Sequence, residues 1–231
     1  MTSQLSRVEV TLRGSIPLRA RDYASEKMSA LIHLAPSPVL SARVTLTRTH
    51  HRASDQHVIA EATLDVNGRP VRAQIAASSS HEAIDFMQDR LRRKLSQLGR
   101  HPARLGGRDR PRRPYYETVP PAEREVVRHK AYEPEVATPE EAAFDMELMD
   151  YDFQLFTDAE SGWDSIVYRS GGDGYGIARL TEQPKLTLRA AIGALDATDM
   201  TYQFYCDADT GRGNVLYRRH DGNYGLITPA K

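Results

Sequence analysis

The sequence predicts an α+β protein: a β-α-β-β-β-α sandwich, with two helices on one face of a four-stranded sheet, followed by two tandem small β-α-β-β-β units. Three observations predict this architecture. Four segments between residues 7 and 101 alternate apolar and polar side chains, and two segments carry helical stripes. Asn67-Gly68 joins two of the alternating segments as a tight hairpin would. The last hundred residues contain one pattern twice, at an offset of 49 positions.

The sandwich is expected at residues 1–101. Its first strand is predicted near residues 8–12, and a helix over 18–33 follows Gly14 and Pro17 and ends before Pro36. Three further strands are predicted at 42–49, 58–66 and 71–77, each apolar on one face only. Ser78 to Ser80 offer caps for a second helix. The expected core stripes of the two helices are Ala20, Tyr23, Ala24, Met28 and Leu31, and Ile84, Met87, Leu91, Leu95 and Leu98.

The net charge of zero conceals two oppositely charged halves. Residues 1–113 contain 20 Lys and Arg against 10 Asp and Glu, whereas residues 114–231 contain 11 against 21. A front half of net charge +10 is typical of a part that binds a polyanion, and arginine suits bidentate contacts with phosphate. A sheet backed by two basic helices is similar in outline to proteins that recognise double-stranded RNA by shape. A solvated helix face remains the alternative interpretation of these charges.

Four stretches of residues 7–101 resemble, in order and spacing, the N-terminal domain of bacterial ribosome hibernation-promoting factors. They are VEVTLRGSIPLRARDYASEKMSAL, ARVTLTR, the Asn-Gly hairpin with VRAQI, and SSSHEAIDFMQDRLRRKLSQL. The resemblance implies a domain without enzymatic activity that occupies the small-subunit cleft where messenger and transfer RNA bind. By position it assigns ribosomal RNA contacts to Lys27, Arg90, Arg93 and Lys94. Basic residues of the nearby loop and of the domain's end complete the predicted RNA-binding set: Arg48, His50, His51, Arg52 and Arg100.

A linker is expected at residues 102–125, where Pro and Gly are frequent and no apolar period is present. Its first half contains the basic run from Arg104 to Arg113. This run either follows a phosphate backbone, becoming ordered on binding, or serves as a solubilising tether.

The duplicated units are expected at residues 126–179 and 180–231. In each, Tyr-Arg and Tyr-Gly are separated by five residues, at Tyr168 to Gly176 and at Tyr217 to Gly225. Their strands are apolar on both faces, and one helix can cover only one face of so small a sheet. A unit of about fifty residues is also marginal alone, so each unit is predicted to pair with another. The predicted pairing residues are Phe153, Leu155, Val167, Tyr168, Phe204, Leu216, Tyr217 and Tyr224.

The stretch GNVLYRRHDGNYGLITP is similar to the closing signature of the C-terminal domain of long hibernation factors, and SIVYRSGGDGYGIARL is a degraded version of it. The resemblance implies a homodimerising domain, present once in long family members, that ties two ribosomes together. Because this chain contains two copies, we expect them to pair within one chain. The protein would then be a monomer that binds the small subunit or the whole ribosome, through rRNA and ribosomal proteins, and silences single ribosomes.

Other classes of function find little support. The glycine-rich stretch at 170–176 lacks the Lys-Ser/Thr of a phosphate-binding loop, and we interpret it as a turn. His50, His51 and His57 lack further ligands at metal-binding spacing, and Cys206 is expected to be a packed thiol. The acidic residues before Gly162 and Gly211 are predicted to shape hairpin turns instead of binding calcium.

We therefore expect no enzyme, no metal and no cofactor. One cysteine, no apolar leader and no membrane span favour a cytoplasmic protein. The alternative function is a stress regulator that binds another RNA or DNA through its basic domain. In that case the C-terminal half would be a protein-interaction or homodimerisation module, including one that dimerises ribosomes.

Overall fold

The structure is a computed structural model of the chain. It describes residues 8–48, 58–98, 119–170, 174–219 and 221–230. The chain divides into two compact units, each described below by itself. Unit 1 comprises Met1–Ala103 and Glu147–Tyr151, and unit 2 comprises Arg104–Met146 and Asp152–Lys231. Within the described ranges, no helix is both long enough and apolar enough to cross a lipid bilayer.

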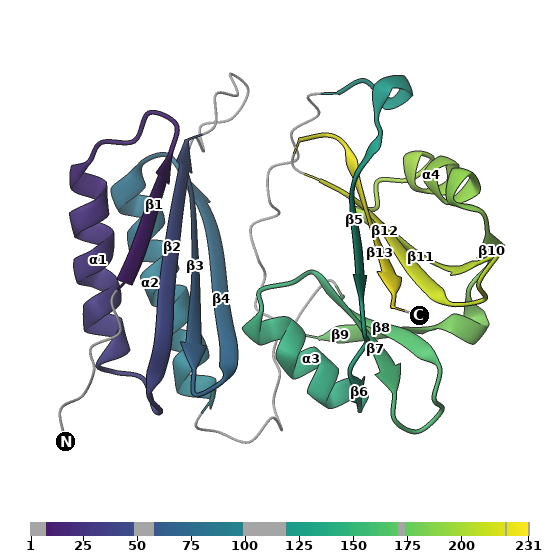
Figure 1. Cartoon of the computed structure of the whole chain (residues 1–231), viewed down its shortest axis with the longest axis horizontal. Coiled ribbons are helices and arrows are strands. Elements are labelled where there is room, and N and C mark those ends of the chain that lie inside the picture. The colour runs from purple at the N-terminus through teal and green to yellow at the C-terminus, as the bar shows by residue number, and fades with distance from the viewer. Residues whose placement is uncertain (1–7, 49–57, 99–118, 171–173, 220, 231) are drawn as a thin grey trace. The chain divides into compact units, whose positions relative to one another are not determined.

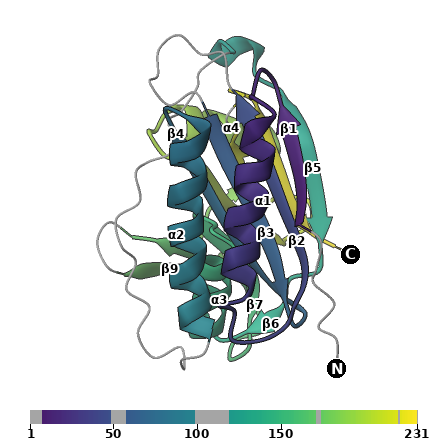
Figure 2. The ribbon, with the colours of Figure 1, turned by 90° about the vertical axis from the view of Figure 1, so that its left-hand side faces the viewer.

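Unit 1 is the predicted sandwich. Its sheet has the order β1-β2-β3-β4, with β1 parallel to β2 and the other pairs antiparallel. Both helices lie side by side across one face of the sheet (Figures 1 and 2). The predicted β-α-β-β-β-α order is confirmed by the elements β1 (Val8–Arg13), α1 (Arg19–Ile32), β2 (Val39–Arg48), β3 (Val58–Val66), β4 (Arg69–Ala77) and α2 (Ser80–Leu98).

Alternation places the core of unit 1 between the sheet and the helices. Along β3 every second residue is buried, from Val58 to Val66. The predicted helical stripes are buried as well, except that Tyr23 and Leu98 are only half-buried. The hairpin from β3 to β4 turns at Asn67 and Gly68 with positive φ at both residues, the backbone that an Asn-Gly pair favours.

Unit 2 contains two sheets, one for each copy of the repeat (Figure 1). The first sheet has the order β6-β7-β8-β9, and the second has the order β10-β11-β12-β13-β5. A helix follows the short strand of each copy, α3 (Pro139–Leu148) in the first and α4 (Leu188–Asp196) in the second. The strands are β5 (Val126–Tyr132), β6 (Val136–Ala137), β7 (Phe153–Asp158), β8 (Asp164–Arg169), β9 (Tyr175–Arg179), β10 (Lys185–Leu186), β11 (Tyr202–Asp207), β12 (Gly213–Arg218) and β13 (Tyr224–Pro229).

The place of β5 corrects the predicted composition of the repeats. The β-α-β-β-β order predicted for residues 126–179 makes this strand the first of the first unit. Instead β5 runs parallel to β13 in the second sheet, whereas β9 pairs with β8 alone among the described strands. Because β9 forms the edge of the first sheet, it does not also pair with β13 in the second sheet. The earlier strand β5 fills the edge beside β13.

The predicted linker is also shorter than expected at its far end. A 3₁₀ turn forms at Pro121–Glu123, and Arg124 then packs against the second repeat, with its guanidinium 3.4 Å from the carboxylate of Asp196. The end of the predicted linker is therefore part of unit 2. The rest of it, including Arg104 to Arg113, lies outside the described residues.

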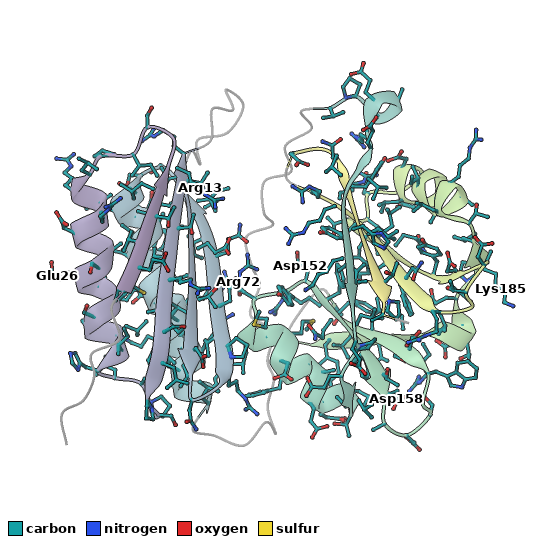
Figure 3. All side chains as sticks on the ribbon, viewed as in Figure 1. Arg13, Glu26, Arg72, Asp152, Asp158 and Lys185 are labelled. Carbon is teal, nitrogen blue, oxygen red and sulfur yellow. The ribbon has the colours of Figure 1, made fainter. Side chains whose placement is uncertain are left out.

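The hairpin turns are built as the repeated acidic residues predicted. Asp158 ends β7 (labelled in Figure 3), and its carbonyl accepts a hydrogen bond from Gly162 N at 2.7 Å. Asp207 ends β11 and accepts one from Gly211 N at 2.8 Å. Both glycines have positive φ, at 72° and 70°. The carboxylates of Asp158 and Asp207 accept hydrogen bonds from backbone N–H groups within the turns. The prediction that these acidic residues shape the hairpin turns is confirmed.

The repeated Tyr-Arg and Tyr-Gly pairs form a cross-strand contact. Tyr168 lies opposite Gly176, and Tyr217 lies opposite Gly225. A Cβ atom added to Gly176 would lie 2.3 Å from the Tyr168 ring, and one added to Gly225 would lie 2.2 Å from the Tyr217 ring. The tyrosine ring therefore covers a strand glycine in both copies. The five residues between Tyr-Arg and Tyr-Gly place the tyrosine opposite this glycine on the neighbouring strand.

Replacing Gly225 with Ala is expected to destabilise unit 2 by about 1–3 kcal/mol, because the Tyr217 ring must move away from the new methyl group. Urea unfolding followed by tryptophan fluorescence measures this, since Trp163 is the sole tryptophan and lies in unit 2. Gly193→Ala is the matched control. Gly193 lies in α4 with open space around it, so alanine there should stabilise the unit by about 1 kcal/mol. Shifts in the same direction for both variants would contradict this account.

Candidate RNA interface and the paired repeats

The predicted RNA-binding residues that the structure describes come from α1, β2 and α2 of unit 1. They are Lys27, Arg48, Arg90, Arg93 and Lys94. His50, His51, Arg52 and Arg100 lie outside the described residues. Packing of α1 against α2 over the sheet brings the basic residues of the two helices onto one layer of the unit.

Lys27 is held between the two helices. Its Nζ lies 2.8 Å from Asp85 Oδ1 and 5.0 Å from the centre of the Tyr23 ring. The Tyr23 hydroxyl donates a hydrogen bond to the same oxygen at 2.8 Å. The ion pair raises the pKa of Lys27 and lowers the pKa of Asp85. Both side chains remain partly exposed, so Lys27 carries a charge that a partner can reach but that Asp85 partly neutralises.

Arg93 is exposed on α2, beside the exposed Arg92. Arg93 Nε donates to the carbonyl of Asp89 one turn earlier, and Arg92 lies 3.6 Å from the Asp89 carboxylate at a largely solvated position. An exposed ion pair such as that of Arg92 with Asp89 contributes little to stability, so Arg92 can exchange it for another anion. The exposed Arg93 guanidinium is bound to a backbone carbonyl and can likewise accept an anionic partner. The prediction did not include Arg92 among the RNA contacts, although its place in the basic run could have suggested it.

Arg90 and Lys94 point to a different partner. Lys94 is 3% exposed, and its Nζ donates to Asp150 Oδ1 at 2.8 Å and to the carbonyl of Glu147 at 2.6 Å. Arg90 Nε lies 3.1 Å from the same carboxylate oxygen of Asp150. Asp150 is itself buried and belongs to the segment 147–151 of unit 1. The assignment of Arg90 and Lys94 to ribosomal RNA stays a prediction. In this structure their charges face a buried carboxylate, as a buried cation requires.

Arg48 ends β2 and is half-buried. Its Nε is buried and has no hydrogen-bond partner among the residues the structure describes. The carbonyl of Arg48 lies 3.1 Å from where a Cβ on Gly14 would be, so glycine permits the close approach between this strand end and the loop after β1.

In unit 2, strands from both repeats share one apolar cluster. Two of its residues, Leu155 and Ile166, come from the first copy, and Phe204, Cys206 and Val215 come from the second. Leu180, at the start of the second copy, completes the buried set. Around them pack half-buried side chains of both copies: Phe153, Tyr168, Ala178, Tyr202 and Ile227. The two sheets therefore bury one face of each against the other.

Aromatic rings of the predicted pairing set lie at this shared face. The centre of the Phe153 ring lies 4.7 Å from that of the Tyr202 ring and 6.3 Å from that of the Tyr217 ring. The ring centres of Tyr168 and Tyr202 are 6.4 Å apart. Burial, together with the nearby Tyr168, raises the pKa of Tyr202 strongly. The structure thus brings together Phe153, Leu155, Tyr168, Phe204 and Tyr217 of the predicted set.

Three residues of the predicted set lie elsewhere. Leu216 and Tyr224 belong to a second cluster with Ala191 and Leu195 of α4, on the opposite face of the second sheet. The hydroxyl of Tyr224 donates to the Asp196 carboxylate at 2.6 Å, which fixes the ring beneath α4. Val167 is fully buried and, by strand alternation, faces away from Ile166 and the shared cluster. For these three residues the structure differs from the prediction, because strands apolar on both faces do not reveal which face meets the other copy.

An ion pair between the copies was not predicted. Arg212 Nε lies 2.8 Å from Asp164 Oδ2, and Arg212 Nη2 donates to Asp164 Oδ1 at 3.1 Å. The backbone N–H of Gly213 donates to Asp164 Oδ2 at 2.8 Å. Asp164 raises the pKa of the Arg212 guanidinium. No pattern along the sequence indicated this pair, since its members are 48 residues apart.

Two sequence comparisons bear on the family. The profile described as Sigma 54 modulation protein / S30EA ribosomal protein matches residues 6–100. The profile of the corresponding C-terminal domain matches twice, over residues 121–177 and 179–226. The chain belongs to the S30EA ribosomal protein family. The double match agrees with the duplication that the 49-residue offset predicted.

The chain is similar to several characterised relatives. It is 39% identical to the dormancy associated translation inhibitor of Mycobacterium tuberculosis over 138 residues, 60% of this chain and 48% of that protein. The chain thus spans about half the length of that relative. It is 30% identical to the ribosome hibernation promotion factor of Deinococcus radiodurans over 177 residues, 68% of this chain and 89% of that protein.

Among solved structures, the crystal structure of the Thermus thermophilus Protein Y N-terminal domain aligns with a TM-score of 0.33 and 22% identity. The alignment covers 40% of this chain and 98% of that domain. Among the residues described, no group of three or more His, Cys, Asp and Glu side chains is placed to hold a metal ion.

Removing the Leu155 side chain beyond Cβ is expected to lower the stability of unit 2 by about 2–5 kcal/mol, because the residue is buried in the cluster that both copies share. The measurement is urea unfolding followed by the fluorescence of Trp163. Val136→Ala provides the control, since Val136 is 69% exposed and its loss should change stability by less than about 0.5 kcal/mol. An equal, small effect of both variants would show that the shared cluster does not hold unit 2 together.

Proposed function

We propose that this chain silences translation by binding single ribosomes, with unit 1 on ribosomal RNA of the small-subunit decoding cleft, where it blocks messenger and transfer RNA. The two C-terminal repeats pair within the chain, so the protein does not tie two ribosomes together. The observation that carries the second statement is the apolar cluster to which both copies of the repeat contribute. The proposed site of action is the cytoplasm.

Family membership and charge support the proposed RNA contact. The relatives that resemble this chain are named for ribosome hibernation and for translation inhibition. The excess of basic residues lies in the first 113 residues, and phosphate contacts by such residues give affinity that depends little on sequence. Arg92 and Arg93 are the exposed cations of α2. In α1, Arg19 and Arg21 are exposed and Lys27, which the family resemblance assigns to RNA, is partly exposed. Arg92, Arg93 and Lys27 are the proposed contacts within the described part of unit 1.

The RNA contact can be tested with Arg92→Gln/Arg93→Gln and binding to purified small ribosomal subunits. We expect affinity at physiological salt to fall at least tenfold, and the slope of log affinity against log salt to become less steep by about one to two. Arg43→Gln is the matched control, because Arg43 is exposed on β2 beside Glu9 and away from the helices. An equal loss in the control would contradict the assignment to α2.

Competition separates the proposed cleft from other nucleic acids. Messenger RNA bound to the small subunit should prevent binding of this chain, whereas unrelated duplex RNA or DNA should compete weakly. Equal affinity for small subunits and for unrelated duplex would favour the alternative, a regulator that binds other RNA or DNA.

Single-ribosome binding is tested by sedimentation of ribosomes with the purified chain. The expected result is a single-ribosome peak that contains the protein, without growth of a ribosome-dimer peak as the protein is added. A dominant ribosome-dimer peak would contradict the proposal that the repeats satisfy one another.

A further inference from the structure

The two repeats meet about a pseudo-twofold axis. The 49-residue offset makes Phe153 equivalent to Tyr202 and Tyr168 equivalent to Tyr217. The contacts Phe153–Tyr217 and Tyr168–Tyr202 are therefore one contact made twice, at 6.3 Å and 6.4 Å. Phe153 and Tyr202 are in contact, with their ring centres 4.7 Å apart. A residue that contacts its own equivalent lies at the axis.

Asp164 and Gly213 form a second pair on this axis, since they too are 49 positions apart and in contact. A Cβ atom added to Gly213 would lie 2.8 Å from Asp164 Cβ and 2.8 Å from the Phe204 ring. The axis therefore has room for one side chain at this position, and the first repeat supplies it. The carboxylate is 4% exposed and is bound by Arg212 through two hydrogen bonds.

The contact of Asp164 with Arg212 and Gly213 can form only between the first repeat and the second. The residue equivalent to Arg212 in the first copy is Trp163. If the first repeat paired with another copy of itself, two buried Asp164 carboxylates would meet at the axis without either arginine, and like charges in a buried site strongly disfavour ionisation of both. If the second repeat paired with itself, two Arg212 side chains would lack a carboxylate at the axis.

Packing in the shared cluster also favours pairing of the first repeat with the second over pairing of either repeat with a copy of itself. Equivalent positions are filled by unequal side chains: Leu155 and Phe204, Ile166 and Val215, Ala178 and Ile227. Two second repeats would place two Phe204 and two Ile227 side chains in one cluster, which overpacks it. Two first repeats would leave it underfilled. The larger Phe204 lies against Gly213, and the smaller Leu155 belongs to the repeat that contributes Asp164.

We propose that Asp164, together with Arg212 and Gly213, makes the first repeat select the second repeat as its partner and reject a second copy of itself. The surface of the first repeat thus fits a repeat that presents Arg-Gly at the axis. This inference rests on the proposed pairing within the chain and names the residues that determine it. Ribosomes are not needed to test it, so a result on the free chain is independent of where the protein binds.

The first experiment measures coupling with substitutions that change charge and little else. Asp164→Asn, Arg212→Gln and the double variant are unfolded with urea as full-length chains, and Trp163 reports on unit 2. Each single substitution should lower the folding equilibrium constant of unit 2 by about 10- to 100-fold, as expected for hydrogen bonds to charged groups. The double variant should be no less stable than the weaker single variant. Additive losses would show that the two residues act separately and would overturn the proposal.

The second experiment tests partner choice in trans. One full-length chain carries Asp164→Gly, which places glycine at both axial positions. The other carries Gly213→Asp with Phe204→Leu, which places aspartate at both and removes the ring that would clash. Each chain alone should unfold in unit 2 at a lower urea concentration than the wild-type chain. Mixed in equal amounts, they should form a 1:1 complex in sedimentation velocity, because Asp164 of one chain meets Arg212-Gly213 of the other.

A chain with Gly213→Asn and Phe204→Leu separates the effect of charge from that of size. It should be at least tenfold more stable in unit 2 than the Gly213→Asp chain at pH 7. The difference should shrink as the pH is lowered, because a proton on one carboxyl group of the axial pair removes the repulsion between like charges. Equal stability of the Asn and Asp chains at pH 7 would overturn the proposal. The absence of a 1:1 complex from the mixture would overturn it as well, because the residues would then support folding without selecting a partner.

Discussion

The C-terminal half depends on one constraint: its small sheets are apolar on both faces and must bury both. In the second copy, α4 covers one face, over Tyr205, Leu216 and Tyr224. The other face has no helix of its own and is buried by the first copy of the repeat. A unit of about fifty residues gains too little from one buried face to be stable alone. The second face therefore makes a partner a requirement of folding, and the chain carries that partner as its own second copy.

The cross-strand contact of tyrosine over glycine serves the same requirement. Tyr168 and Tyr217 cover glycines on their neighbouring strands, and they also contact rings of the opposite copy. The glycines let each ring lie flat on its own sheet, which brings the two sheets together over aromatic side chains. The hairpin turns at Gly162 and Gly211 allow β8 and β12 to return antiparallel to β7 and β11.

Duplication relaxes a restriction that applies to symmetric dimers. In a dimer of identical units, a residue on the twofold axis meets a copy of itself, so a buried charge there would meet a like charge. In this chain the two axial residues are encoded separately, and they have become aspartate in one copy and glycine in the other. The difference between the copies lets the buried Asp164 carboxylate pair with the partly exposed Arg212 at this position. A surface suited to self-association can in this way become an internal contact.

Much of this architecture could be predicted from sequence. Alternation along β3, the Asn67-Gly68 hairpin and the helical stripes are local patterns, and they predicted unit 1 element by element. The offset of 49 predicted the copies. Contacts between distant segments could not be predicted in the same way. No local signal showed that β5 joins β13, that Tyr224 faces α4, or that Lys94 is buried beside Asp150, since charged residues on a helix usually face solvent.

The two repeats bury their apolar faces against one another within a single chain. Native mass spectrometry of a mixture of isotopically labelled and unlabelled protein tests it most directly, at concentrations where a homodimer of the repeats would form. We expect two separate monomer masses, near the 25.9 kDa of one chain and at the mass of its labelled counterpart. A dimer of intermediate mass, with one labelled and one unlabelled chain, would contradict it.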